Sequence, residues 1–168
     1  MKSPLFTIGL IGLTGGTLLL GGCGVGKKPP SNPDTGVTQP VKHEHHAPHG
    51  GTPIVLGDEA YHLELVRDAA TGKLQAFVLD GEMENFVRCP AATFEVTATV
   101  AGEKRTLVFR AIADPATGEK VGDTALFEAQ ADWLKTTGKF DAVLMALTIQ
   151  GSTFANVSFN FPRGNDRD

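Results

Sequence analysis

Strict alternation of apolar and polar residues recurs along the chain from Thr52 onward. In 94–100 (FEVTATV) and 156–161 (NVSFNF), every second residue is apolar. A period of two over five to seven residues is typical of strands that bury one face. This alternation predicts that the body of the chain is a β-domain.

Turn signals separate the alternating runs. The segments 70–73 (ATGK) and 116–119 (ATGE) place a glycine where a turn requires a positive φ, and Gly102-Glu103 separates two runs at hairpin distance. One helical turn is expected at 132–136, with Asp132 as its cap. The predicted strands are 53–56, 60–67, 73–80, 93–100, 104–113, 123–130, 140–149 and 153–161.

Seven or eight short strands over about 110 residues predict an all-β fold. The expected architecture is a two-sheet antiparallel sandwich of immunoglobulin-like type, and a small barrel is the alternative. The run 142–147 (AVLMAL) is apolar at every position. It predicts a central strand that is covered on both sides.

The segment before the β-domain has a different composition. Residues 24–50 contain five of the ten prolines and almost no large apolar residue. Such a segment buries too little surface to offset its ordering entropy. We therefore expect a flexible, disordered tether at 23–50, the β-domain at 51–163 and a disordered tail at 164–168.

The N-terminus has the pattern of an export signal. Lys2 precedes an uncharged apolar run, 5–20, which is interrupted by glycines and is short for a transmembrane helix. The stretch 20–23 (LGGC) resembles the bacterial lipobox. That resemblance implies a signal peptide at 1–22 and a lipid, with acyl chains such as palmitate, on Cys23. An ordinary secretory peptide or a retained anchor is the alternative.

Charge and the residue after Cys23 bear on location. Removing 1–22 takes away one lysine and no acid, which leaves 14 Lys and Arg against 19 Asp and Glu, a net charge of −5. A mildly acidic chain without a basic stripe is not expected to bind nucleic acid. Residue 24 is Gly, whereas an Asp directly after the lipidated cysteine would resemble an inner-membrane retention signal. We expect a lipoprotein of the bacterial cell envelope, on the outer membrane where the host has two, with its domain facing the periplasm or the exterior.

Cys89 is the one cysteine besides Cys23. With Cys23 lipidated, no intramolecular disulfide can form. Cys89 precedes Pro90 at the end of a run, and we expect a buried small hydrophobe, with a lone reactive thiol as the alternative.

Histidines are concentrated at the end of the tether. Four of the five, His43, His45, His46 and His49, lie within seven residues (HEHHAPH). Neutral imidazole is a ligand for Zn²⁺, Cu²⁺ and Ni²⁺, and neighbouring imidazoles can converge without a fold. The cluster predicts a metal-binding tract of modest affinity with no obligatory cofactor, and a soluble linker with incidental histidines is the alternative. Because the tether is expected to contribute little to the core, replacing these histidines should leave domain stability nearly unchanged.

His62 is the fifth histidine. Alternation places it with Glu64 on the side of the strand opposite Tyr61 and Leu63. It is a candidate ligand that would complete a site with His49 if the strand lies near the end of the tether. A surface or edge residue is the alternative.

A resemblance extends over about residues 43–80. The order of the histidine-rich tract, Pro48-His49-Gly50-Gly51, and 61–66 (YHLELV) is similar to that in a group of uncharacterised small bacterial lipoproteins. A similar tract followed by P-H-G-G occurs near the start of some periplasmic adaptor proteins of heavy-metal efflux pumps. The resemblance implies metal handling in the envelope, with a metal-efflux or other envelope protein as partner. The long helical hairpin of an efflux adaptor is missing from this sequence.

The sequence gives little support for catalysis. It has no G-x-S-x-G elbow, and the acidic run of Asp80, Glu82 and Glu84 is expected to form a solvated loop. Trp133 and Leu134 are expected to close one end of the domain. We therefore expect a non-enzymatic lipoprotein that binds copper or zinc through its tract. The rival interpretation is an envelope interaction or structural module.

The lipobox gives a first testable prediction. Replacing Cys23 with Ala should block lipid attachment, so the variant should remain unprocessed or leave the membrane fraction, since several acyl chains on one residue anchor stably. Detergent-phase partitioning of the two proteins checks this. Equal solubility of wild type and variant would contradict the lipobox interpretation.

Overall fold

The computed structural model describes residues 46–166 as a β-domain. In this range no helix is long and apolar enough to cross a membrane. The elements are β1 (Thr52–Leu56), β2 (Tyr61–Asp68), β3 (Lys73–Asp80), β4 (Thr93–Val100), β5 (Glu103–Ala111), β6 (Leu126–Gln130), the 3₁₀ turn η1 (Asp132–Lys135), β7 (Phe140–Ile149) and β8 (Ser152–Phe161).

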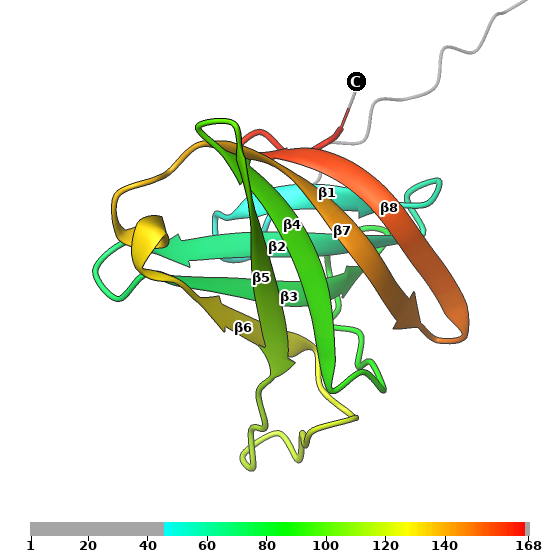
Figure 1. Cartoon of the computed structure of the whole chain (residues 1–168). Coiled ribbons are helices and arrows are strands. Elements are labelled where there is room, and N and C mark those ends of the chain that lie inside the picture. Colours follow the sequence, from blue (N-terminus) through cyan, green and yellow to red (C-terminus); the bar gives the residue numbers. More distant parts are fainter. Residues whose placement is uncertain (1–45, 167–168) are drawn as a thin grey trace, which may run out of the picture. The chain divides into compact units, whose positions relative to one another are not determined.

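All eight strands belong to one antiparallel sheet, in the order β1-β2-β3-β6-β5-β4-β7-β8. Figure 1 shows that β1, β2, β3 and β6 lie behind β5, β4, β7 and β8 and run in a clearly different direction. The inward faces of these two halves enclose the core. Phe94 of β4 stacks on Phe109 of β5 at 4.7 Å between ring centroids, and Phe127 of β6 meets Phe94 edge-on at 5.1 Å.

The first and last strands approach each other, so the sheet is nearly closed. Asn165 joins them, since its Oδ1 accepts the Val55 N–H at 2.8 Å and its Nδ2 donates to the Val55 carbonyl at 3.1 Å. Gly164 fits there because a Cβ at this position would overlap the Pro53 carbonyl oxygen. Gly164 and Asn165 therefore belong to the folded domain, although the sequence prediction assigned them to the tail.

The prediction of an all-β domain with seven or eight strands is confirmed. Most strand bounds agree within one or two residues, and Gly72 and Gly118 have the expected positive φ, 71° and 74°. The finer prediction of two separate immunoglobulin-like sheets is not confirmed, because the strands form one continuous sheet. The β4–β5 hairpin turns at Ala101 and Gly102, both with positive φ, and Glu103 already belongs to β5.

The strands β7 and β8 change the side that faces the core. In β7 the even-numbered Leu144 is buried, whereas from Leu147 onward the odd-numbered residues are buried. Met145 lies at the change and is 43% exposed. On β8 the change falls at Asn156, whose φ is 56°. The prediction that 142–147 is covered on both sides was wrong, because the apolar run marks a strand that switches faces.

The 3₁₀ turn η1 closes one end of the core, as predicted for this segment. Leu134 is buried, and Trp133 packs edge-on against Phe140 at 5.2 Å. The prediction that Asp132 caps the turn was wrong. Ala131 holds the cap position, and Asp132 lies inside the turn, where Lys135 Nζ donates to its carboxylate at 2.7 Å.

The change of faces in β7 provides a matched pair of variants. Leu144→Asp should abolish cooperative folding, since an unpaired charge at this fully buried position costs several kcal/mol. Met145→Asp, at the neighbouring exposed position, should change the free energy of unfolding by about 0.5 kcal/mol or less. Circular dichroism during urea titration measures both. Equal effects of the two substitutions would contradict the assigned faces.

Candidate functional site

The Pro48-His49-Gly50-Gly51 motif forms a tight turn that leads into β1. The Gly50 N–H donates to the Ala47 carbonyl at 3.0 Å, which places Pro48 at the second position of a β-turn, where its fixed φ is favourable. Gly50 has a φ of 66°, a conformation that glycine adopts readily. The local sequence therefore determines the path of the chain after His49.

Gly51 lies directly against β2. A Cβ at this position would approach the Leu65 carbonyl oxygen to 2.7 Å and Glu64 Cγ to 2.8 Å. Only a residue without a side chain allows this approach. The sequence prediction placed the end of the tether at Gly50, but the structure shows that the motif already packs against the β-domain.

The Glu64 side chain is fully buried beneath this motif. Its Oε1 accepts the backbone N–H groups of His49 and Gly51, each at 2.8 Å, and its Oε2 lies 2.8 Å from His49 Nδ1. A buried carboxylate is costly unless hydrogen bonds replace its hydration. Three donors from two residues supply these bonds, so Glu64 fastens the His49 ring and the adjacent backbone to β2.

The contact with Glu64 determines the tautomer of His49. A carboxylate only accepts hydrogen bonds, so the neutral ring carries its proton on Nδ1 and its lone pair on Nε2. The His49 side chain is 37% exposed, and Nε2 makes no hydrogen bond within residues 46–166. Among the described residues, no hydrogen-bond donor therefore occupies the Nε2 lone pair of His49.

Two phenylalanines restrict the orientation of the ring. Phe77 of β3 stacks on His49 with 3.9 Å between centroids and 14° between planes. Phe86 lies at 5.8 Å in a tilted arrangement and is itself 53% exposed. With Nδ1 bonded and one face stacked, the imidazole is held in place like a residue of the folded domain.

The ring forms part of the wall of a pocket of about 520 Å³. Arg88 in the pocket is held by the Thr117 carbonyl at 2.7 Å and lies 3.8 Å from Glu119. Among the charged lining residues, Asp114 and Glu119 outnumber Arg88, and this surplus of negative charge favours a cation. The lining residues are His49, Phe77, Asn85, Phe86, Arg88, Asp114, Thr117, Glu119, Ala125 and Leu126.

The predicted ligands have different positions. His49 lies in the pocket wall and His46 is exposed three residues earlier, while His43, His45 and Cys23 lie outside the described residues. His62 is fully buried, with Nδ1 3.2 Å from the Asp80 carbonyl oxygen, and it does not line the pocket. Within residues 46–166, no three His, Cys, Asp or Glu side chains are grouped to hold a metal. Of the described histidines, His49 is therefore the one that lines this pocket.

The acidic run after β3 stabilises a loop. Asp80 accepts hydrogen bonds from Asn85 Nδ2 at 2.6 Å and from the Glu84 N–H at 2.9 Å, and Glu82 and Glu84 are exposed. Burial acts to raise the pKa of Asp80, but the hydrogen bonds from Asn85 and Glu84 outweigh it and leave the pKa below its ordinary value. These hydrogen bonds show that Asp80 stabilises the loop after β3.

Cys89 is buried, which agrees with the first of the two alternatives for this residue. Its backbone N–H donates to the Thr124 carbonyl at 2.9 Å, and burial raises the pKa of the thiol to about 11. Since the thiolate is the form that binds metal and reacts, this thiol is a poor ligand and nucleophile near neutral pH.

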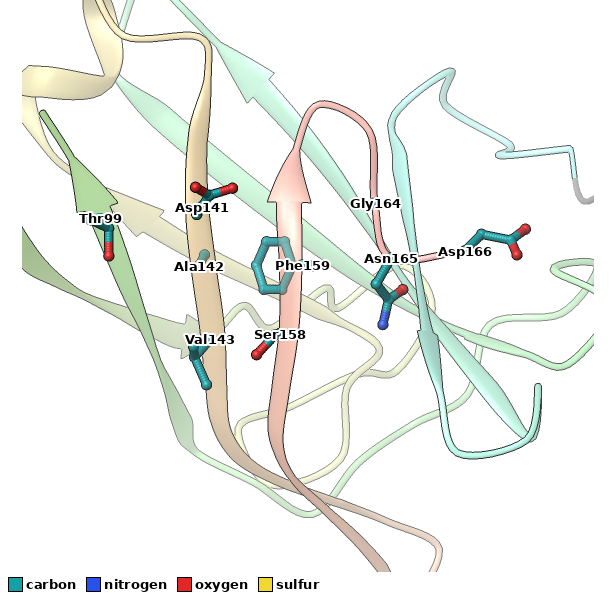
Figure 2. A pocket seen from close by; sticks show the side chains of 9 residues that line it. All are labelled: Thr99, Asp141, Ala142, Val143, Ser158, Phe159, Gly164, Asn165 and Asp166. Carbon is teal, nitrogen blue, oxygen red and sulfur yellow. The ribbon is translucent and has the colours of Figure 1, made fainter. Parts of the chain in front are cut away.

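A second pocket, of about 400 Å³, lies along β7 and β8 (Figure 2). Two of its polar side chains are already engaged, since Asp141 accepts from Asn160 Nδ2 at 2.8 Å and Asn165 is bonded to Val55. No histidine or cysteine lines it, whereas the first pocket presents an available imidazole nitrogen. The candidate functional site is therefore the pocket beside His49.

Comparison of the chain with protein-family models, curated proteins and solved structures gave no match.

The contacts of His49 change the prediction that replacing the tract histidines leaves the stability of the domain nearly unchanged. His49→Ala removes the Nδ1 donor from a fully buried carboxylate, and it should lower the free energy of unfolding by about 1–3 kcal/mol. His46→Ala, at an exposed position, is the control and should change it by about 0.5 kcal/mol or less. Urea unfolding of both variants checks this. An unchanged midpoint for His49→Ala would mean that the contact with Glu64 contributes nothing to stability.

Proposed function

We propose that this protein is a lipid-anchored lipoprotein of the bacterial envelope that binds a transition metal of the copper and zinc class. The observation that carries the proposal is the placement of His49. Its Nδ1 is engaged by buried Glu64, and Nε2 remains available on a partly exposed ring in a pocket with surplus negative charge. A neutral imidazole fixed in this way is a typical metal ligand.

The remaining ligands in this proposal come from the tract before the turn. His43, His45 and His46 lie three to six residues before His49, close enough in sequence to reach the same ion. Imidazole suits Zn²⁺, Cu²⁺ and Ni²⁺, whereas Cu⁺ prefers sulfur ligands. The buried thiol of Cys89 does not supply one. A set of imidazoles therefore favours divalent ions.

The proposal assigns binding and handling of metal, without catalysis. The lipid on Cys23 would attach the chain to the membrane, and the segment up to the turn would separate the β-domain from the lipid surface. A metal-efflux or other envelope protein would be the partner that exchanges metal with it. One observation favours the rival, a protein-interaction module, since Phe86 exposes 53% of its surface at the pocket.

Metal titration tests the proposal. Zn²⁺ or Cu²⁺ added to the full chain in detergent at pH 7.5 should bind in calorimetry, and binding should weaken sharply by pH 5.5. Protons compete with metal for imidazole nitrogens, and the ordinary imidazole pKa is about 6.5, so the metal-binding form is lost as the pH falls. Replacing His43, His45, His46 and His49 together with Ala should remove most of the binding.

The fifth histidine provides the control for this titration. His62→Ala should leave metal affinity within about twofold, because this ring is buried outside the pocket, provided that circular dichroism shows a folded variant. If the variant without the four tract histidines binds as tightly as wild type, the tract is a bystander. The interaction module would then be the better interpretation.

A further inference from the structure

We propose that Glu64 is the positioning residue of a metal site on His49, and that metal bound there stabilises the β-domain as a whole. This inference rests on the proposed function. It goes further because it assigns a role to a buried strand residue outside the histidine tract. It also makes the occupied site part of the folded domain.

The hydrogen bonds of Glu64 support its role as the positioning residue for His49. One carboxylate oxygen binds two backbone N–H groups, which fixes the chain on both sides of Gly50, and the other oxygen binds Nδ1. Histidines that bind metal through one nitrogen commonly donate the other N–H to a carboxylate, which fixes the tautomer and raises ligand basicity. Glu64 therefore presents the Nε2 lone pair in one direction before metal arrives.

The stacking of the His49 ring on Phe77 makes the orientation of the ring depend on the folded sheet. A metal lies in the plane of the imidazole that binds it, and Phe77 holds this plane at 14° to its own ring. Phe77 and Glu64 lie directly opposite each other on β3 and β2. The orientation that suits metal thus depends on two neighbouring strands, and unfolding of the sheet removes it.

The coupling follows from linkage. A ligand stabilises a protein only by its preference for the folded over the unfolded chain. Metal whose ligands were equally available in the folded and the unfolded chain would leave the unfolding midpoint unchanged. Metal held by the positioned His49 binds the folded chain more tightly, so it must raise the midpoint.

The experiment uses the full chain in detergent with Zn²⁺ as the probe. Calorimetry gives the affinity, and circular dichroism gives the thermal midpoint with and without Zn²⁺ at a hundredfold excess over Kd. The wild-type midpoint should rise by several degrees, with roughly 10 °C as the limit when the unfolded chain holds no metal. Glu64→Gln should bind Zn²⁺ about 10–100-fold more weakly. Glu95→Gln, the same change at an exposed position of β4, should match wild type.

His49→Phe decides the matter if Glu64→Gln fails to fold. Phenylalanine can keep the stack on Phe77 but offers no nitrogen, so Zn²⁺ should no longer raise the midpoint. A variant with Ala at 43, 45 and 46 should still show a rise, at higher Zn²⁺ concentration. Zn²⁺ binding without any rise in the wild-type midpoint, or equal affinity of Glu64→Gln and Glu95→Gln, would overturn this inference and leave the proposed function standing. Absence of Zn²⁺ binding to wild type would overturn both.

Discussion

The burial of the Glu64 carboxylate is the constraint that fixes the turn at the start of the described chain on β2. A carboxylate without contact to water requires donors, and here they come from the backbone of His49 and Gly51 and from the His49 ring. This demand explains why a glycine follows the turn and why the turn lies flat on β2. It also explains why the histidine closest to the β-domain has a fixed ring, although it belongs to a tract with the composition of a linker.

Most strands could be predicted because alternation is a local property of the sequence. On a half-buried strand, the apolar residues at every second position identify the face that points to the core. The closure of the sheet could not be predicted in this way, because it depends on Asn165 meeting Val55 across 110 positions of sequence. The change of faces at Met145 was also missed, because a continuous apolar run fits both a switching strand and a strand covered on both sides.

The candidate site was predicted only in part, for a related reason. Clustering identified His49 as a ligand candidate, and alternation placed His62 and Glu64 on one side of β2. Neither pattern tells whether another segment covers that side. The structure shows that it is covered, so both side chains are buried, and the acid next to the lone histidine becomes the partner of His49. The available signal was an acid inside the largely apolar run 61–66 (YHLELV).

A buried acid needs an explanation beyond stability. Replacing a buried polar pair with apolar residues of similar volume is often neutral or stabilising, so Glu64 and His49 are not the cheapest way to attach this turn to β2. An apolar contact would hold the backbone, but it would leave the direction of an imidazole lone pair undetermined. The arrangement seen here fixes that direction through Nδ1 and through the stack on Phe77. Glu64 and its partner thus fit a site where ring orientation matters, and ligation of a metal by Nε2 requires such an orientation.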